Sequence, residues 1–168
     1  MQSMRRILCY LCFTLIWASA LLSATSARAG LPEGFVPAYA NETEGVKIVQ
    51  YIPEGETDEA WSEMYTFLVF KKAQASQYLS VARHFGEELQ TSCEGAKLRG
   101  QHVDAEKMYL LAFECPAVSA SAEQSESMVG LLRPYKENVL FVQYVRRGPK
   151  GSPPDSTEMI NKLYEAAH

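Results

Sequence analysis

Residues 46–72 read VKIVQYIPEGETDEAWSEMYTFLVFKK, and this stretch decides the fold. Its first part is rich in β-branched residues up to Pro53, which has no amide hydrogen to donate and therefore ends a strand. Residues 64–70 are apolar on both alternating faces, which is typical of a strand buried on both sides. The stretch predicts two strands, the second near the middle of a sheet, joined by an acidic connection that carries Trp61.

Five further elements follow along the chain. Residues 75–91 carry apolar side chains at helical spacing, and residues 101–115 predict one long strand or two strands broken near Asp104. Residues 128–132 and 139–145 predict a hairpin, and a capping box formed by Asp155 and Glu158 opens a final helix. The order ββαβββα predicts an α+β fold, a mainly antiparallel sheet covered by two amphipathic helices.

The first 29 residues have the three parts of a secretory signal peptide. Residues 1–6 are basic, residues 7–22 are apolar, and Ala27 and Ala29 are the small residues that a signal peptidase requires. We expect cleavage before Gly30, an N-terminal arm at residues 30–45 and a single domain at residues 46–168. A retained membrane anchor is disfavoured because no stop-transfer charge cluster follows. The expected location is the periplasm or the exterior of the cell.

Cleavage would change the charge of the chain. The removed segment holds three arginines and no acidic residue, so 16 basic and 20 acidic residues become 13 and 20, a net charge of −7. A surface of that sign repels phosphate groups. Nucleic acid and anionic membranes are therefore not expected partners.

Two of the four cysteines would remain after cleavage. Cys9 and Cys12 belong to the signal segment, which leaves Cys93 and Cys115. In an oxidising compartment such a pair is expected to form a disulfide. The alternative, a nucleophilic cysteine, is disfavoured because export makes a free thiol improbable.

His102, Asp104 and Glu106 form the strongest polar pattern in the chain. On a strand, alternating residues point to one face, so these three side chains would meet there. They would suit a metal site or an acid-base hydrolase, or they form the solvent side of an edge strand, which we favour because no second histidine is near. No nucleophile elbow, phosphate loop, zinc signature or dinucleotide fingerprint is present, so we assign no catalytic residue and no cofactor.

One resemblance rests on two short motifs. The run YIPEGE at residues 51–56, followed by WSEM at residues 61–64, resembles small exported bacterial proteins of unknown function. In those proteins a strand, a P-x-G-[QE] turn and a W-[ST]-E-M segment occur together. The resemblance implies export and a shared fold, and it implies no activity.

Three functions remain open from the sequence. The first is a non-enzymatic binding or accessory protein of the bacterial envelope, whose partner is a small ligand or an envelope protein. It predicts an apolar groove between helix and sheet, bordered by Trp61, Tyr65, Arg133 and Tyr144. The second is the hydrolase described above. The third is a secreted interaction protein that acts on a host or a neighbouring cell.

Overall fold

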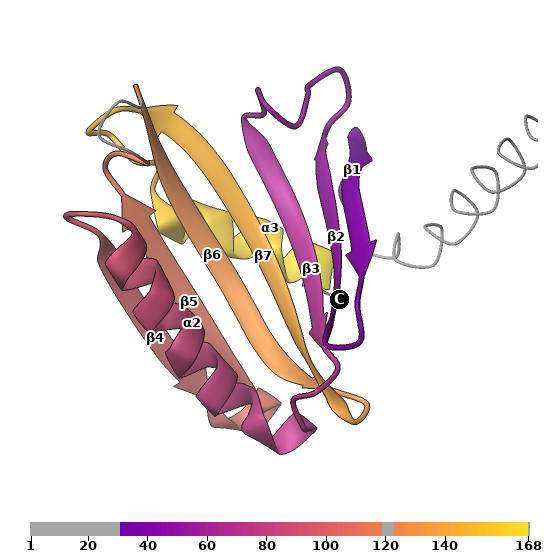
Figure 1. Ribbon diagram of the computed structural model, residues 1–168. Helices are drawn as coiled ribbons and strands as arrows, with labels where there is room; N and C mark the ends of the chain where they lie inside the picture. The colour runs from indigo at the N-terminus through magenta and orange to yellow at the C-terminus, as the bar shows by residue number, and fades with distance from the viewer. Residues whose placement is uncertain (1–30, 119–122, 168) are drawn as a thin grey trace, which may run out of the picture.

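The computed structural model describes residues 31–118 and 123–167 (Figure 1). The predicted signal peptide, residues 1–29, lies outside the described residues. The described part contains seven strands, two α-helices and two short 3₁₀ turns. In chain order these are β1 (Phe35–Glu42), β2 (Val46–Pro53), β3 (Glu63–Phe70), η2 (Ala75–Gln77), α2 (Tyr78–Ser92), β4 (Lys97–Val103), η3 (Asp104–Glu106), β5 (Met108–Cys115), β6 (Gln124–Tyr135), β7 (Asn138–Pro149) and α3 (Ser156–Ala167).

The strands form one antiparallel sheet in the order β1-β2-β3-β7-β6-β5-β4. The α+β class and the antiparallel sheet are therefore confirmed. The predicted element order is wrong, because the chain runs βββαββββα. β3 lies between β2 and β7, near the middle of the sheet as predicted.

Two strands account for the difference in order. β1 lies within the segment predicted to be an extended arm, and a shift of register between Pro37 and Tyr39 accommodates the proline. The segment 101–115 is divided by η3, and Lys107 after it has a φ of 49°, so the chain reverses and β5 pairs with β4. The second of the two predicted alternatives, a break near Asp104, is confirmed.

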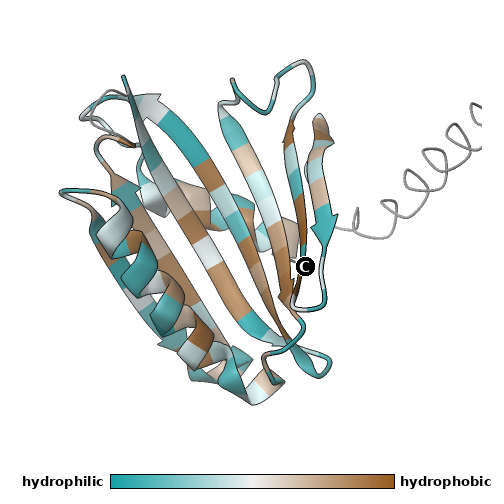
Figure 2. Ribbon diagram, viewed as in Figure 1, coloured by the Kyte–Doolittle hydropathy of each residue, from teal (hydrophilic) through white to brown (hydrophobic). Residues whose placement is uncertain are grey.

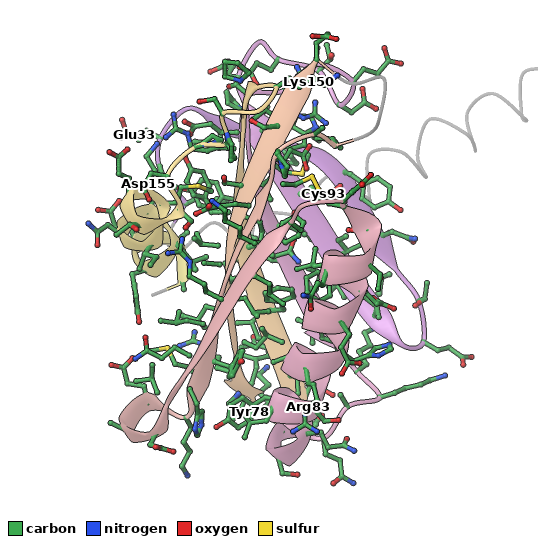
Figure 3. The ribbon with its side chains drawn as sticks, turned by 90° about the vertical axis from the view of Figure 1, so that its left-hand side faces the viewer. Glu33, Tyr78, Arg83, Cys93, Lys150 and Asp155 are labelled. Atoms are coloured by element: carbon green, nitrogen blue, oxygen red, sulfur yellow. A yellow bond between two sulfur atoms is a disulfide. The ribbon has the colours of Figure 1, made fainter. Side chains whose placement is uncertain are left out.

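The helices lie on opposite faces of the sheet (Figure 3). Alternate residues of β7 explain this arrangement, because Val139 and Phe141 pack beneath α2 while Val142 and Tyr144 pack beneath α3. Apolar residues accordingly run along the central strands (Figure 2). α2 lies over the half of the sheet that contains β4 and β5, so in the described part of the chain no helix covers β1–β3 on that face (Figure 1). The predicted covering by two helices is thus partial.

A disulfide ties the end of α2 to the sheet. Cys93, directly after α2, and Cys115, at the end of β5, have their sulfur atoms 2.09 Å apart, as predicted (Figure 3). Closer to the middle of α2, Gly86 lets the helix approach β4, since a Cβ atom there would lie 3.2 Å from a methyl carbon of Leu98. No helix in the described ranges is long and apolar enough to cross a membrane.

Candidate functional site: a groove between α3 and the sheet

A mainly apolar groove of about 240 Å³ lies between α3 and the β4–β5 side of the sheet. It forms because α3 packs chiefly on β6 and β7 and makes few contacts with β5. Apolar residues of β5 and α3 therefore face a space that no side chain of the described residues fills. The lining residues are Arg99, Gly100, Gln101, Leu110, Leu111, Ala112, Val129, Ser156, Thr157, Ile160 and Leu163.

A polar cluster stands at the mouth of this groove. Arg99 donates from Nη2 to Oε1 of Glu114 at 2.7 Å and to Oγ of Ser156 at 2.8 Å. The Ser156 hydroxyl in turn donates to the same carboxylate oxygen at 2.9 Å. The Ser156 residue is only 1% exposed, whereas the Arg99 side chain is 63% exposed. The guanidinium group therefore remains accessible to a ligand although its charge is balanced by Glu114.

The first turn of α3 adds to the polarity of the mouth. Asp155, directly before the helix, accepts a hydrogen bond from the backbone amide of Thr157 at 2.8 Å. This bond holds the pKa of the Asp155 carboxyl below its usual value. The groove lining therefore combines an exposed guanidinium and the first residues of α3 with apolar side chains of β5 and α3. Such an arrangement suits an amphipathic ligand.

Two of the predicted ligand-binding residues are core residues beneath α3. The rings of Tyr65 and Tyr144 stack with centroids 4.6 Å apart, and both residues are fully buried. Lys162 of α3 donates to the Tyr144 hydroxyl at 3.0 Å and pairs with Glu63 at 3.3 Å. Burial, followed by the nearby carboxylate of Glu63, raises the pKa of both hydroxyl groups. These tyrosines support α3 and do not line the groove.

Trp61 and Arg133, the other two predicted binding residues, lie elsewhere. The Arg147 guanidinium stands 3.7 Å above the Trp61 ring, beside a separate hollow of about 450 Å³. Arg133 donates to the backbone oxygen of Ala167 at 2.9 Å, at the end of α3 remote from the groove mouth. The prediction of a single groove bordered by Trp61, Tyr65, Arg133 and Tyr144 therefore does not match the geometry.

The pattern His102, Asp104, Glu106 does not lie on one strand face. His102 is the penultimate residue of β4 and η3 begins at Asp104, so the two carboxylates sit on the turn instead. The His102 ring has Nε2 at 2.6 Å from the Tyr78 hydroxyl and Nδ1 at 3.0 Å from Asp104. Both ring nitrogens are thus engaged. Among residues 31–118 and 123–167 no group of three or more His, Cys, Asp or Glu side chains is arranged to hold a metal ion.

The sequence contained no distinctive signal for the groove residues. Arg99 and Gln101 looked like ordinary polar residues, and Leu110, Ala112 and Ile160 looked like core residues. The only available hint was the predicted contact of the final helix with the sheet. Which strands that helix leaves uncovered depends on its crossing direction.

The comparisons with known proteins identify no family. No protein-family model and no curated protein sequence matches the chain. Among solved structures, the crystal structure of human STARD10 is similar with a TM-score of 0.41 and 9% sequence identity, over 86% of this chain and 77% of that chain. A similarity at this level is too low to assign a function.

Proposed function

We propose that this chain is an exported, non-enzymatic binding or accessory protein of the bacterial envelope that holds a small amphipathic ligand in the groove beneath α3. The observation that supports this proposal is the groove itself, with its apolar walls and the polar cluster of Arg99, Glu114 and Ser156 at its mouth. Binding sites for small molecules are typically concave and apolar with a few placed polar groups. A volume of about 240 Å³ suits a small ligand or one end of a larger one.

The local charges indicate which end of the ligand lies at the mouth. The exposed guanidinium of Arg99, whose charge Glu114 balances, favours a polar group that accepts hydrogen bonds there. The Leu110, Ala112 and Ile160 side chains favour an apolar group further in. The proposed ligand therefore combines an apolar part with a polar group that accepts hydrogen bonds.

The hypothesis that His102 serves a hydrolase receives less support from the geometry than the binding proposal does. The two ring nitrogens of His102 already contact Tyr78 and Asp104. The groove lies on the face of the sheet opposite to Tyr78. A general base needs a nitrogen within reach of a substrate proton. We therefore keep binding as the proposed function.

Fluorescence titration with 1-anilinonaphthalene-8-sulfonate tests the groove, because this probe joins an apolar ring system to a sulfonate. Ala112 lies in the groove wall, so Ala112→Phe fills the space and is expected to remove the enhancement of probe fluorescence. Arg99→Gln is expected to weaken binding of the probe and to reduce its dependence on salt. Unchanged binding by the Ala112→Phe variant would refute this location for the site.

A matched control is available on the opposite face of the sheet. Ala73 lines a second hollow, between the start of α2 and the neighbouring strands, and its exposure is also intermediate. Ala73→Phe adds the same volume there and is expected to leave probe binding unchanged. Equal effects of the two substitutions would indicate a general loss of structure instead of a blocked groove.

Export is a separate part of the proposal and rests on the basic, apolar and small-residue pattern of residues 1–29. The intact mass of the protein recovered from the exported fraction of its host is expected to lack those 29 residues. A full-length mass would contradict export. It would leave the binding proposal for the groove untouched.

A further inference from the structure

β4 forms a regular edge of the sheet. Its seven residues, Lys97 to Val103, pair with β5 without any shift of register, and within residues 31–118 and 123–167 no strand pairs with its outer side. Most residues of the strand are exposed. Gly100, at its centre, has no side chain, and the Tyr109 ring occupies the space above it. The outer backbone groups of β4 are thus available for pairing.

The opposite edge of the sheet, β1, is less regular. β1 contains Pro37, which cannot donate to a neighbouring strand, and its register shifts between Pro37 and Tyr39. Prolines and bulges are features with which natural edge strands avoid pairing with other chains. β4 contains neither. Of the two edges, β4 is therefore the one suited to accept another strand.

We propose that β4 pairs with β4 of a second copy of this chain, antiparallel and centred on Gly100. The two seven-stranded sheets would then continue into each other around a two-fold axis. This pairing sets Gly100 opposite its own counterpart, Arg99 opposite Gln101, Leu98 opposite His102 and Lys97 opposite Val103. It does not depend on whether the groove beneath α3 holds a ligand.

The second copy is favoured by the self-complementarity of the strand. Positive side chains on an edge usually oppose pairing, and β4 carries Lys97 and Arg99. In the register centred on Gly100, neither residue lies directly opposite a like charge, since their direct partners are Val103 and Gln101, and the two Arg99 residues are diagonal neighbours. The Arg99 charge is also already balanced by Glu114 at 2.7 Å. Two copies can therefore pair through β4 without placing two unpaired positive charges directly opposite each other.

The helices leave room for this arrangement. Figure 3 views the molecule from the side of β4 and shows α2 and α3 on opposite sides of the sheet. α2 contacts β5 more than β4, so its axis lies back from the edge. Adjacent strands are about 4.8 Å apart, so two helices set over the β5 strands would be roughly 14 Å apart across the axis, beyond the 8–10 Å of packed helices.

Sedimentation velocity over a series of protein concentrations tests the proposal with the full chain. The expected result is a concentration-dependent dimer. Its dissociation constant is expected to change when a charged residue replaces Gln101. Gln101→Glu places a negative charge directly opposite Arg99 of the other copy, and it is expected to lower the dissociation constant by roughly 2- to 30-fold. Gln101→Lys places a like charge there and is expected to raise it by a similar factor.

Hydrogen exchange then identifies the surface involved. Amides of β4 are expected to gain protection as the concentration of protein rises, whereas amides of β1 are not. A protein that stays monomeric at every concentration overturns the proposal. So does a dimer whose dissociation constant is the same in the Glu and Lys variants, or whose formation protects β1 and leaves β4 unchanged.

Discussion

The disulfide between Cys93 and Cys115 is expected to contribute about 3 kcal/mol to the free energy of unfolding. The two residues are 22 positions apart in the chain. Closing a loop of that length lowers the entropy of the unfolded chain by about 11 cal/mol/K, which corresponds to about 3 kcal/mol at 25 °C. The loop joins the end of α2 to the end of β5, so its constraint acts on both a helix and the sheet.

The perturbation is the double variant Cys93→Ala with Cys115→Ala, compared with the wild type in urea. Both sulfur atoms are buried among Phe113 and Met128, so the void that the alanines leave adds to the loss of stability. With a urea m-value of about 1–3 kcal/mol/M, the midpoint of unfolding is expected to fall by roughly 1–3 M. Circular dichroism and the fluorescence of Trp61 monitor the transition.

Reduction of the wild type provides the matched control, because it opens the loop and keeps both sulfur atoms in place. Reduced wild type is expected to lose about 3 kcal/mol and the alanine variant slightly more. Reductant should not change the alanine variant at all. A loss below about 1 kcal/mol in the reduced wild type would refute the reasoning. The unfolded chain would then gain little freedom when the loop opens.

Three further predictions concern buried tyrosine hydroxyl groups and the carboxylate that caps α3. The hydroxyl of Tyr65 is buried, and no hydrogen-bond partner for it lies among the described residues, so Tyr65→Phe should leave the free energy of unfolding in urea unchanged or raise it. Tyr144→Phe removes the hydrogen bond from the α3 lysine and should lower it by about 1 kcal/mol. The Asp155 carboxyl has a pKa below its usual 3.8, so its contribution is present above that pH and is lost as the pH falls through the lowered pKa. Thermal midpoints of the wild type and Asp155→Ala should therefore differ at pH 7 and converge towards pH 2.

Each of these predictions has a contradicting outcome. Equal destabilisation by the two tyrosine variants would show that the Tyr65 hydroxyl is hydrogen-bonded in solution. A difference between the wild type and the Asp155→Ala variant that persists unchanged at pH 2 would show that the charge of the carboxylate is not what stabilises the start of α3.

The sequence by itself determined the class of the fold and much of its centre. Apolar residues on both alternating faces of residues 139–145 require cover on both sides, and helices pack on both faces of β7. The same pattern in residues 64–70 overstated their burial, because in the described part of the chain no helix covers β3 on the α2 face. Helical periodicity located α2 and α3. Two cysteines on neighbouring elements predicted the disulfide. These features follow from local periodicity and composition, which a single chain displays directly.

β1 could not be predicted from local sequence, because it forms a strand only through its pairing with β2. Its sequence contains proline and polar residues that are typical of a loop, and it becomes a strand only because β2 offers a partner and a bulge accommodates Pro37. The pattern of His102, Asp104 and Glu106 misled for the opposite reason. Alternating residues share one face of a sheet only as long as the strand continues. Here the strand ends before Asp104, because the chain turns at η3.

The groove and the free edge of β4 were decided only by the tertiary structure. Each depends on relations between distant elements: how α3 crosses the sheet, and which strands end the order β1-β2-β3-β7-β6-β5-β4. The alternation along β3 and β7 indicates that Tyr65 and Tyr144 lie on an apolar face of the sheet. It does not indicate what covers them, because α3 is about 12 positions from Tyr144 and about 100 positions from Tyr65 in the chain. Local patterns determine which elements form and which faces are buried. The space left between those elements is determined by how they pack.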